Sequence, residues 1–197
     1  MDLLYYAFGW MGYYAIHSVL ATDQSKEVLQ KTIIPSQWYR LFYNSIAIVL
    51  LINIIFWGEQ LEKVALLNPP WFIMALGGII LILGGYLGWL ALRQYNLSEF
   101  VGTAYLSGTA HHGELNTTGL NARVRHPLYF ATLLVIWGLL IIFPNGSLLI
   151  PILVTTFYIP IGVYFEERKL IKIFGKAYID YKSEVPMIFP KLKNINT

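Results

Sequence analysis

The sequence has no cysteine and few charged residues. The absence of cysteine among 197 residues excludes disulfides, a thiol nucleophile and a thiolate metal site. Charged side chains make up 13% of the chain, whereas a soluble domain carries about 25%. Hydrophobic residues account for 56% of the chain and gather in long runs. This combination is typical of proteins that lie in a bilayer.

Several motifs of soluble enzymes are also absent. The chain has no P-loop, no Gly-x-Gly-x-x-Gly and no Ser-His-Asp order. Its basic residues flank apolar segments, which indicates membrane lipids rather than nucleic acid as a partner. The possible metal ligands are His111, His112, Glu114 and His126. Their spacing fits a metal site poorly, so we expect none.

Five apolar segments are long enough to be membrane-spanning helices: about 3–22, 41–57, 71–92, 128–143 and 148–165. The third has 22 residues without a charge. It would form about 33 Å of helix, enough for a hydrocarbon core of about 30 Å. We therefore predict an all-α membrane protein with about five transmembrane helices in a single membrane domain over residues 1–197.

The positive charges are distributed unevenly between the two sides of these five spans. Of the 14 lysines and arginines, 13 fall on one side. The positive-inside rule assigns that side to the cytoplasm, so the N-terminus is expected outside and the C-terminus inside. After Phe165, apolar residues recur every three or four positions while Lys169, Lys172, Lys176 and Lys182 take other positions. This pattern predicts a C-terminal interfacial helix with its basic side toward the headgroups.

The third segment contains a pair of small residues at helical spacing. Gly84 and Gly88 form a small-xxx-small motif, which lets two helices approach closely. The main interpretation is packing against a helix of the same chain. The alternative is a homodimer that forms through the third span.

Two polar clusters flank the last two apolar segments. Arg125 and His126 precede Pro127, which favours the first position of a helix, and a helix N-terminus attracts anions. Glu166 and Glu167 follow the fifth segment. Two crossings return the chain to the side it left, so the clusters can meet in one site at the membrane surface. There are two simpler interpretations. Arg125 and His126 would be basic residues at the end of a span that only set its orientation, and the two glutamates would only form salt bridges at the surface.

The run Thr-Gly-x-x-x-x-Val-Arg-His-Pro-x-Tyr at 118–129 resembles the signature of integral-membrane methyltransferases, the isoprenylcysteine carboxyl methyltransferase and phospholipid methyltransferase group. The similarity continues through Glu166-Glu167, Phe174-Gly175, Tyr178, Tyr181, Val185-Pro186 and Pro190. In the front half, His17-Ser18, Ala21, Tyr39-Arg40 and Tyr43-Asn44 look more like the NnrU and methanethiol S-methyltransferase branch.

This resemblance implies that S-adenosylmethionine binds between the Arg-His-Pro-x-Tyr and Glu-Glu blocks, within a cofactor-site half at 117–190. The cofactor-binding residues that it implies are Val124, Arg125, His126, Tyr129, Glu166 and Glu167. Arg125 and Glu167 are also the residues implied in catalysis, with Arg125 orienting the acceptor or the cofactor carboxylate. The cofactor would come from the cytoplasm and a lipophilic acceptor from the bilayer.

Three functions stay open at this point. The first is a membrane methyltransferase for a lipid or a small membrane-permeant acceptor, and the second is a small-thiol S-methyltransferase. The third is a non-catalytic, NnrU-like accessory protein in which His17, His111, His112 and His126 bind haem, quinone or metal. Because the loop at 93–127 is long for a compact protein, we also expect part of 100–119 to order over the cofactor.

Overall fold

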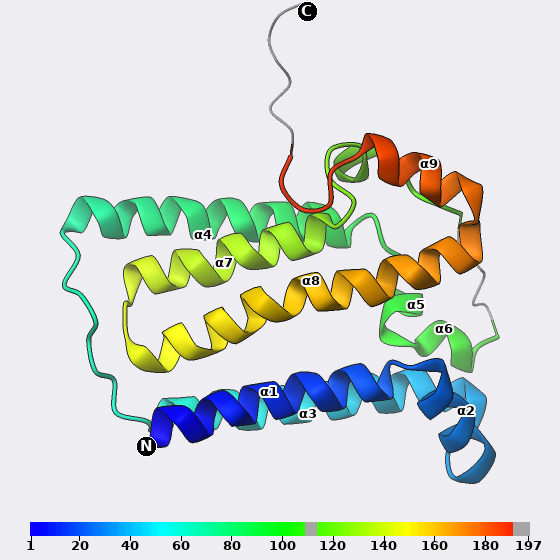
Figure 1. Ribbon diagram of the computed structural model, residues 1–197, viewed down its shortest axis with the longest axis horizontal. Helices are drawn as coiled ribbons and strands as arrows, with labels where there is room; N and C mark the ends of the chain where they lie inside the picture. The colour runs from blue at the N-terminus through cyan, green and yellow to red at the C-terminus, as the bar shows by residue number, and fades with distance from the viewer. Residues whose placement is uncertain (109–113, 191–197) are drawn as a thin grey trace, which may run out of the picture. The chain divides into compact units, whose positions relative to one another are not determined.

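The described part of the chain consists of helices and contains no β-strand (Figure 1). The computed structural model describes residues 1–108 and 114–190. The all-α prediction is confirmed. The elements are α1 (Asp2–Leu20), α2 (Asp23–Thr32), η1 (Ser36–Trp38), α3 (Tyr39–Gln60), α4 (Trp71–Leu92), α5 (Leu97–Val101), α6 (Thr103–Leu106), η2 (Gly119–Ala122), α7 (Pro127–Ile142), α8 (Gly146–Phe174) and α9 (Lys176–Glu184).

Each of the five predicted segments overlaps a helix, and α4 covers the same residues as the third segment. Three of the described helices are long and apolar enough to cross a membrane: Ser36–Gln60, which combines η1 and α3, then α4 and α8. The helix α7 is apolar but shorter. The helix α1 has 19 residues, which include several tyrosines, His17 and Ser18.

The last long helix extends farther than predicted. We expected the fifth segment to end at Phe165, but α8 continues to Phe174. The Glu, Arg, Lys and Leu residues that follow Phe165 are strong helix formers, so the end of the apolar run is not the end of the helix. Gly175, with a φ of +57°, separates α8 from α9. The predicted interfacial helix therefore corresponds to the last turns of α8 followed by α9.

Contacts within the chain cluster in two units. The described residues of the first unit are 1–68, 95–108 and 143–158. Those of the second unit are 69–94, 114–142 and 159–190. One of the boundaries between the units falls within α8, between Tyr158 and Ile159. The single membrane domain predicted from the sequence stays a prediction.

In the first unit, α1 packs along α3 (Figure 1). Tyr6 and Trp10 of α1 and Ile54 of α3 form its buried core. Gly58 makes room for Tyr6, because a Cβ atom at Gly58 would lie 2.2 Å from the Tyr6 hydroxyl oxygen. Aromatic side chains therefore fill the contact between these two helices.

The short helices α5 and α6 are attached to α3 by polar contacts. The Asn44 side-chain amide donates to the carbonyl oxygens of Phe100 at 3.1 Å and Val101 at 2.7 Å. The Arg40 guanidinium donates to the Tyr105 hydroxyl at 2.9 Å. These contacts hold the first part of the long loop on α3. Residues 109–113, which include His111 and His112, lie outside the described residues, and closure of the loop over a cofactor stays a prediction.

In the second unit, α4 packs closely along α7 (Figure 1). A Cβ atom at Gly84 would lie 2.8 Å from the backbone nitrogen of Val135, and one at Gly138 would lie 2.8 Å from that of Leu81. Glycines on both helices therefore let the two backbones approach. Packing within one chain accounts for Gly84, and the homodimer alternative stays a prediction.

Candidate active site

The Arg125-His126 block is held by the segment that follows α9. The backbone N–H of Arg125 donates to the Pro186 carbonyl at 2.9 Å, and that of His126 donates to the Met187 carbonyl at 3.1 Å. Pro127 then begins α7, at a position where a missing N–H costs nothing. Backbone hydrogen bonds therefore join the Arg125-His126 block to the distant segment of Pro186 and Met187.

Arg125 connects three parts of the second unit. Its Nε and Nη2 atoms lie 2.8 Å and 2.7 Å from Oε1 of Glu167 on α8. Its Nη1 donates to the carbonyl oxygens of Lys182 at 3.1 Å and of Val185. The Arg125 and Glu167 side chains are only 8% and 6% exposed. Because all three guanidinium nitrogens have partners within the protein, Arg125 fastens the start of α7 to α8 and to the end of α9.

Glu167 also has partners on both carboxylate oxygens. Its Oε2 accepts from the Lys182 ammonium at 2.5 Å. Its Oε1, which binds Arg125, also lies 3.3 Å from Nε2 of His126. A buried carboxylate requires such partners, because an unpaired charge away from water is strongly unfavourable. Glu167 is therefore the centre of a buried ion-pair network.

Glu166 lies in different surroundings from its neighbour. Its Oε2 accepts from the Tyr129 hydroxyl at 2.9 Å and lies 3.8 Å from Nδ1 of His126. Its side chain is 43% exposed. Successive residues of a helix point about 100° apart, which places Glu167 in the network while Glu166 stays accessible. Of the two glutamates, Glu166 is the one that a ligand can reach.

A layer of buried side chains supports these groups. Tyr178 is 1% exposed, and burial raises the pKa of its phenol, with the charge of Glu167 adding to the rise. Tyr178 therefore stays neutral at physiological pH. Tyr181 donates to the Asn121 carbonyl at 2.6 Å, and Val124 is buried beside Arg125 in the sequence. The Tyr181 hydrogen bond thus joins α9 to η2, just before the Arg-His block.

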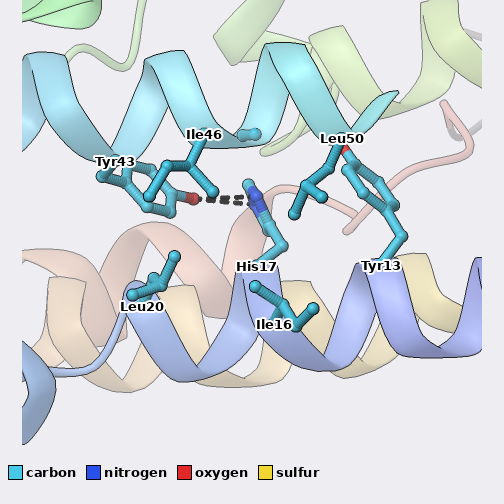
Figure 2. Close-up of a pocket in the computed structure, with 8 residues that line it drawn as sticks. Tyr13, Ile16, His17, Leu20, Tyr43, Ile46 and Leu50 are labelled. Carbon is cyan, nitrogen blue, oxygen red and sulfur yellow. Dashed lines mark hydrogen bonds between the residues drawn. The ribbon is translucent and has the colours of Figure 1, made fainter. Parts of the chain in front are cut away.

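The structure brings the predicted site residues into one unit. Arg125, His126, Tyr129, Glu166 and Glu167 share direct contacts, and Val124 is buried next to them. Among residues 1–108 and 114–190, no group of His, Asp and Glu is arranged as a metal site. His17 lies in the first unit, where it contacts Tyr43 (Figure 2).

Lys182 is a site residue that the sequence reasoning missed. We expected it to face lipid headgroups with the other lysines, but that assignment is wrong because its ammonium binds Glu167. Its neighbour Lys176 does follow a surface pattern, with an exposed pair to Asp180. Only the position of Lys182 between Tyr181 and Val185 in the family-like run could have indicated its role.

Comparison with known families decides what kind of protein carries this arrangement. A family model described as phospholipid methyltransferase matches residues 72–177, more than half of the chain. The chain belongs to the phospholipid methyltransferase family. The matched range includes α4 from its second residue, α7, α8 and the site residues from Val124 to Glu167.

Relatives with curated functions are similar to this chain over most of its length. Methanethiol S-methyltransferase 2 of Bradyrhizobium diazoefficiens is 32% identical over 192 residues, covering 92% of this chain and 71% of the relative. The methanethiol S-methyltransferase of Pseudomonas deceptionensis is 28% identical, covering 90% and 68%. That of Crocosphaera subtropica is 29% identical, covering 92% and 72%. No solved structure matches the chain.

The comparisons agree with the membrane character of the helices. Three described helices can span a bilayer, and both the family and these relatives are methyltransferases. This member of the phospholipid methyltransferase family is thus an integral membrane methyltransferase. The accessory-protein alternative is wrong in treating the chain as non-catalytic.

Proposed function

We propose that the protein transfers a methyl group from S-adenosylmethionine to a small uncharged thiol. The family requires a methyl donor, and a sulfonium donor fits the accessible carboxylate of Glu166. The thiol is supported by relatives that are named methanethiol S-methyltransferases and that align with about nine-tenths of this chain. A one-carbon thiol also enters a membrane readily, as an acceptor approaching apolar helices requires.

The side chains around Glu166 fit this donor. S-adenosylmethionine carries a positive sulfonium, an ammonium group and a ribose diol, all of which a carboxylate can bind. The Tyr129 ring lies beside Glu166, to which its hydroxyl donates, and offers an aromatic face to a cation. The observation that carries the proposal is the 43% exposure of the Glu166 side chain next to a fully paired Glu167.

The two glutamates then have different roles. Glu166 binds the cationic or hydroxyl groups of the donor, and the Tyr129 hydroxyl orients its carboxylate. Glu167 and Arg125 act as positioning residues, because their ion pair fixes α8 against the start of α7. His126 lies between the two carboxylates, 3.3 Å from Glu167 and 3.8 Å from Glu166. The donor supplies an electrophilic methyl group, and the protein supplies alignment and exclusion of water.

The orientation in the membrane belongs to the same proposal. The excess of lysine and arginine on one side supports a cytoplasmic C-terminus and an outside N-terminus. The network around Glu167 would then lie at the cytoplasmic surface, where S-adenosylmethionine is made available. The acceptor would reach the protein through the bilayer.

Purified protein in detergent tests the proposal in two steps. Calorimetry with S-adenosylhomocysteine should show binding by the wild type and a lower affinity in Glu166→Gln. Headspace gas chromatography should then detect dimethyl sulfide when methanethiol and S-adenosylmethionine are supplied. Methylation of extracted phospholipids without dimethyl sulfide would reject the thiol and retain the donor.

A further inference from the structure

The Arg125 guanidinium is already bound within the second unit. Its Nε and Nη2 atoms bind Glu167, and its Nη1 donates to the carbonyl oxygens of Lys182 and Val185. Its side chain is 8% exposed. The family resemblance implies Arg125 as a residue that orients the cofactor carboxylate, but a buried guanidinium with these partners is not accessible to that carboxylate.

Lys182 is the cation of the same network that a ligand can reach. Its side chain is 46% exposed. An ammonium group has three N–H donors, and one of them binds Oε2 of Glu167 at 2.5 Å. Because Glu167 is its side-chain partner among the residues that the structure describes, the other two donors remain for a ligand.

The position of Lys182 is fixed at both ends of the residue. Its carbonyl oxygen accepts from Nη1 of Arg125 at 3.1 Å, and its ammonium binds Glu167. It lies four residues after Tyr178, which is 1% exposed, and residues four apart share one face of a helix. Lys182 therefore lies on the packed side of α9, unlike Lys176, whose side chain is 85% exposed.

The network has one accessible charge of each sign. Glu167 has a single negative charge but contacts two cations, Arg125 and Lys182. Glu166 adds a second carboxylate, and its side chain is 43% exposed. His126 lies between the two carboxylates. The accessible ammonium of Lys182 and the accessible carboxylate of Glu166 thus belong to one connected site.

We propose that Lys182 binds the carboxylate of the amino-acid group of S-adenosylmethionine, while Glu166 binds its cationic or hydroxyl groups. The inference rests on the proposed function and adds the residue that recognises this carboxylate. An amino-acid group carries both charges within a few bonds, so it is complementary to an accessible cation and anion in one site. Lys182 keeps its bond to Glu167 and uses another N–H for the ligand.

Calorimetry with two matched ligands tests this role without turnover. S-adenosylhomocysteine carries the carboxylate, whereas its decarboxylated analogue, S-adenosyl-3-thiopropylamine, keeps the ammonium, ribose and adenine groups. The wild type should bind S-adenosylhomocysteine about 10-fold more tightly, as expected for one charge-assisted hydrogen bond at a half-exposed side chain. In Lys182→Met this preference should disappear, because only the affinity for S-adenosylhomocysteine falls.

Three further variants serve as comparisons. Lys182→Gln removes the charge but can still donate to Glu167, so it should lose the same preference with less effect on the network. Lys182→Arg keeps a cation and should retain the preference. Lys176→Met removes a positive charge from an exposed position of the same helix and should bind both ligands as the wild type does. Wild-type affinity for the decarboxylated analogue shows that a variant is folded.

The outcomes separate this inference from the proposed function. Equal affinity of the wild type for the two ligands would overturn the assignment of Lys182. An equal loss for both ligands in the two uncharged Lys182 variants would also overturn it, because Lys182 would then act only by holding Glu167. Either result leaves S-adenosylmethionine as the methyl donor. A wild type that binds neither ligand would reject the proposed donor and this inference with it.

Discussion

Glu166 and Glu167 are chemically identical neighbours in different surroundings, which makes them a matched pair for mutation. Glu167→Gln leaves Arg125 and Lys182 without their counter-charge, so we expect a loss of about 3 kcal/mol in the free energy of unfolding. Glu166→Gln changes an accessible group and should alter stability by less than about 1 kcal/mol. Unfolding in detergent, monitored by circular dichroism, measures the free energy of unfolding of both mutants. Equal stability losses would contradict the two-role assignment.

Lys182 is the residue whose role the structure changed. Its ammonium holds Oε2 of Glu167, and its own side chain is 46% exposed. We expect Lys182→Met to lower stability by about 1 kcal/mol, a value reduced for solvent screening. Lys176→Met on the same helix is the control, because the pair of Lys176 and Asp180 is largely exposed and should contribute little. Thermal melts in one detergent compare them, and a larger loss for Lys176 would contradict the network.

The sequence predicted which residues lie together in the site but not the direction in which each side chain points. Two crossings of the membrane imply that Arg125 and Glu167 can come together, and they do. The choice between Glu166 and Glu167 depends on the rotation of α8 about its axis, which a nearly uniform apolar sequence does not specify. Lys182 was missed because an amphipathic pattern indicates the face on which a residue lies but not the partner that its side chain binds, here Glu167 of α8.

At the scale of elements, the glycines of α4 determine how it packs. Gly84 and Gly85 are adjacent, yet a Cβ atom at Gly84 would contact the backbone of α7, whereas one at Gly85 has nothing within 4 Å. Overpacking by Gly84→Ala should therefore cost about 1–3 kcal/mol. Gly85→Ala should be neutral or stabilise by up to about 1 kcal/mol, since alanine favours a helix.

Thermal stability of the two single mutants in the same detergent measures this difference. The comparison removes most effects of helix propensity, because both positions lie mid-helix in α4. If Gly85→Ala is the more destabilising change, the orientation of α4 toward α7 is wrong and a partner helix on the opposite face is required.

Helix positions were predictable from apolar runs, whereas some helix ends were not. The limits of α4 follow from the charge-free run at 71–92, which Arg93 ends. The helix α8 continues beyond the end of its long apolar run at Phe165, because the charged residues that follow also favour a helix. It ends at Phe174, before Gly175 with its positive φ. The helices α5 and α6 were not predicted, since they are short and depend on contacts with Asn44 and Arg40.

At the scale of the whole molecule, the charge distribution predicts the orientation in the membrane. We expect the N-terminus outside and the C-terminus in the cytoplasm, because 13 of 14 lysines and arginines fall on one side of five spans. Tags at the two ends, probed with a protease in sealed inside-out vesicles, test this. Protection of the N-terminal tag and cleavage of the C-terminal tag is the expected result. Cleavage of both tags would contradict an odd number of spans.

The most direct test of the central claim is the formation of dimethyl sulfide by purified wild type and Glu166→Gln, with S-adenosylmethionine varied at fixed methanethiol. We predict product from the wild type and a KM for S-adenosylmethionine that is about 10- to 100-fold higher in Glu166→Gln, as expected for one lost charge-assisted hydrogen bond. Absence of dimethyl sulfide from the wild type, or an unchanged KM in the variant, would contradict the account.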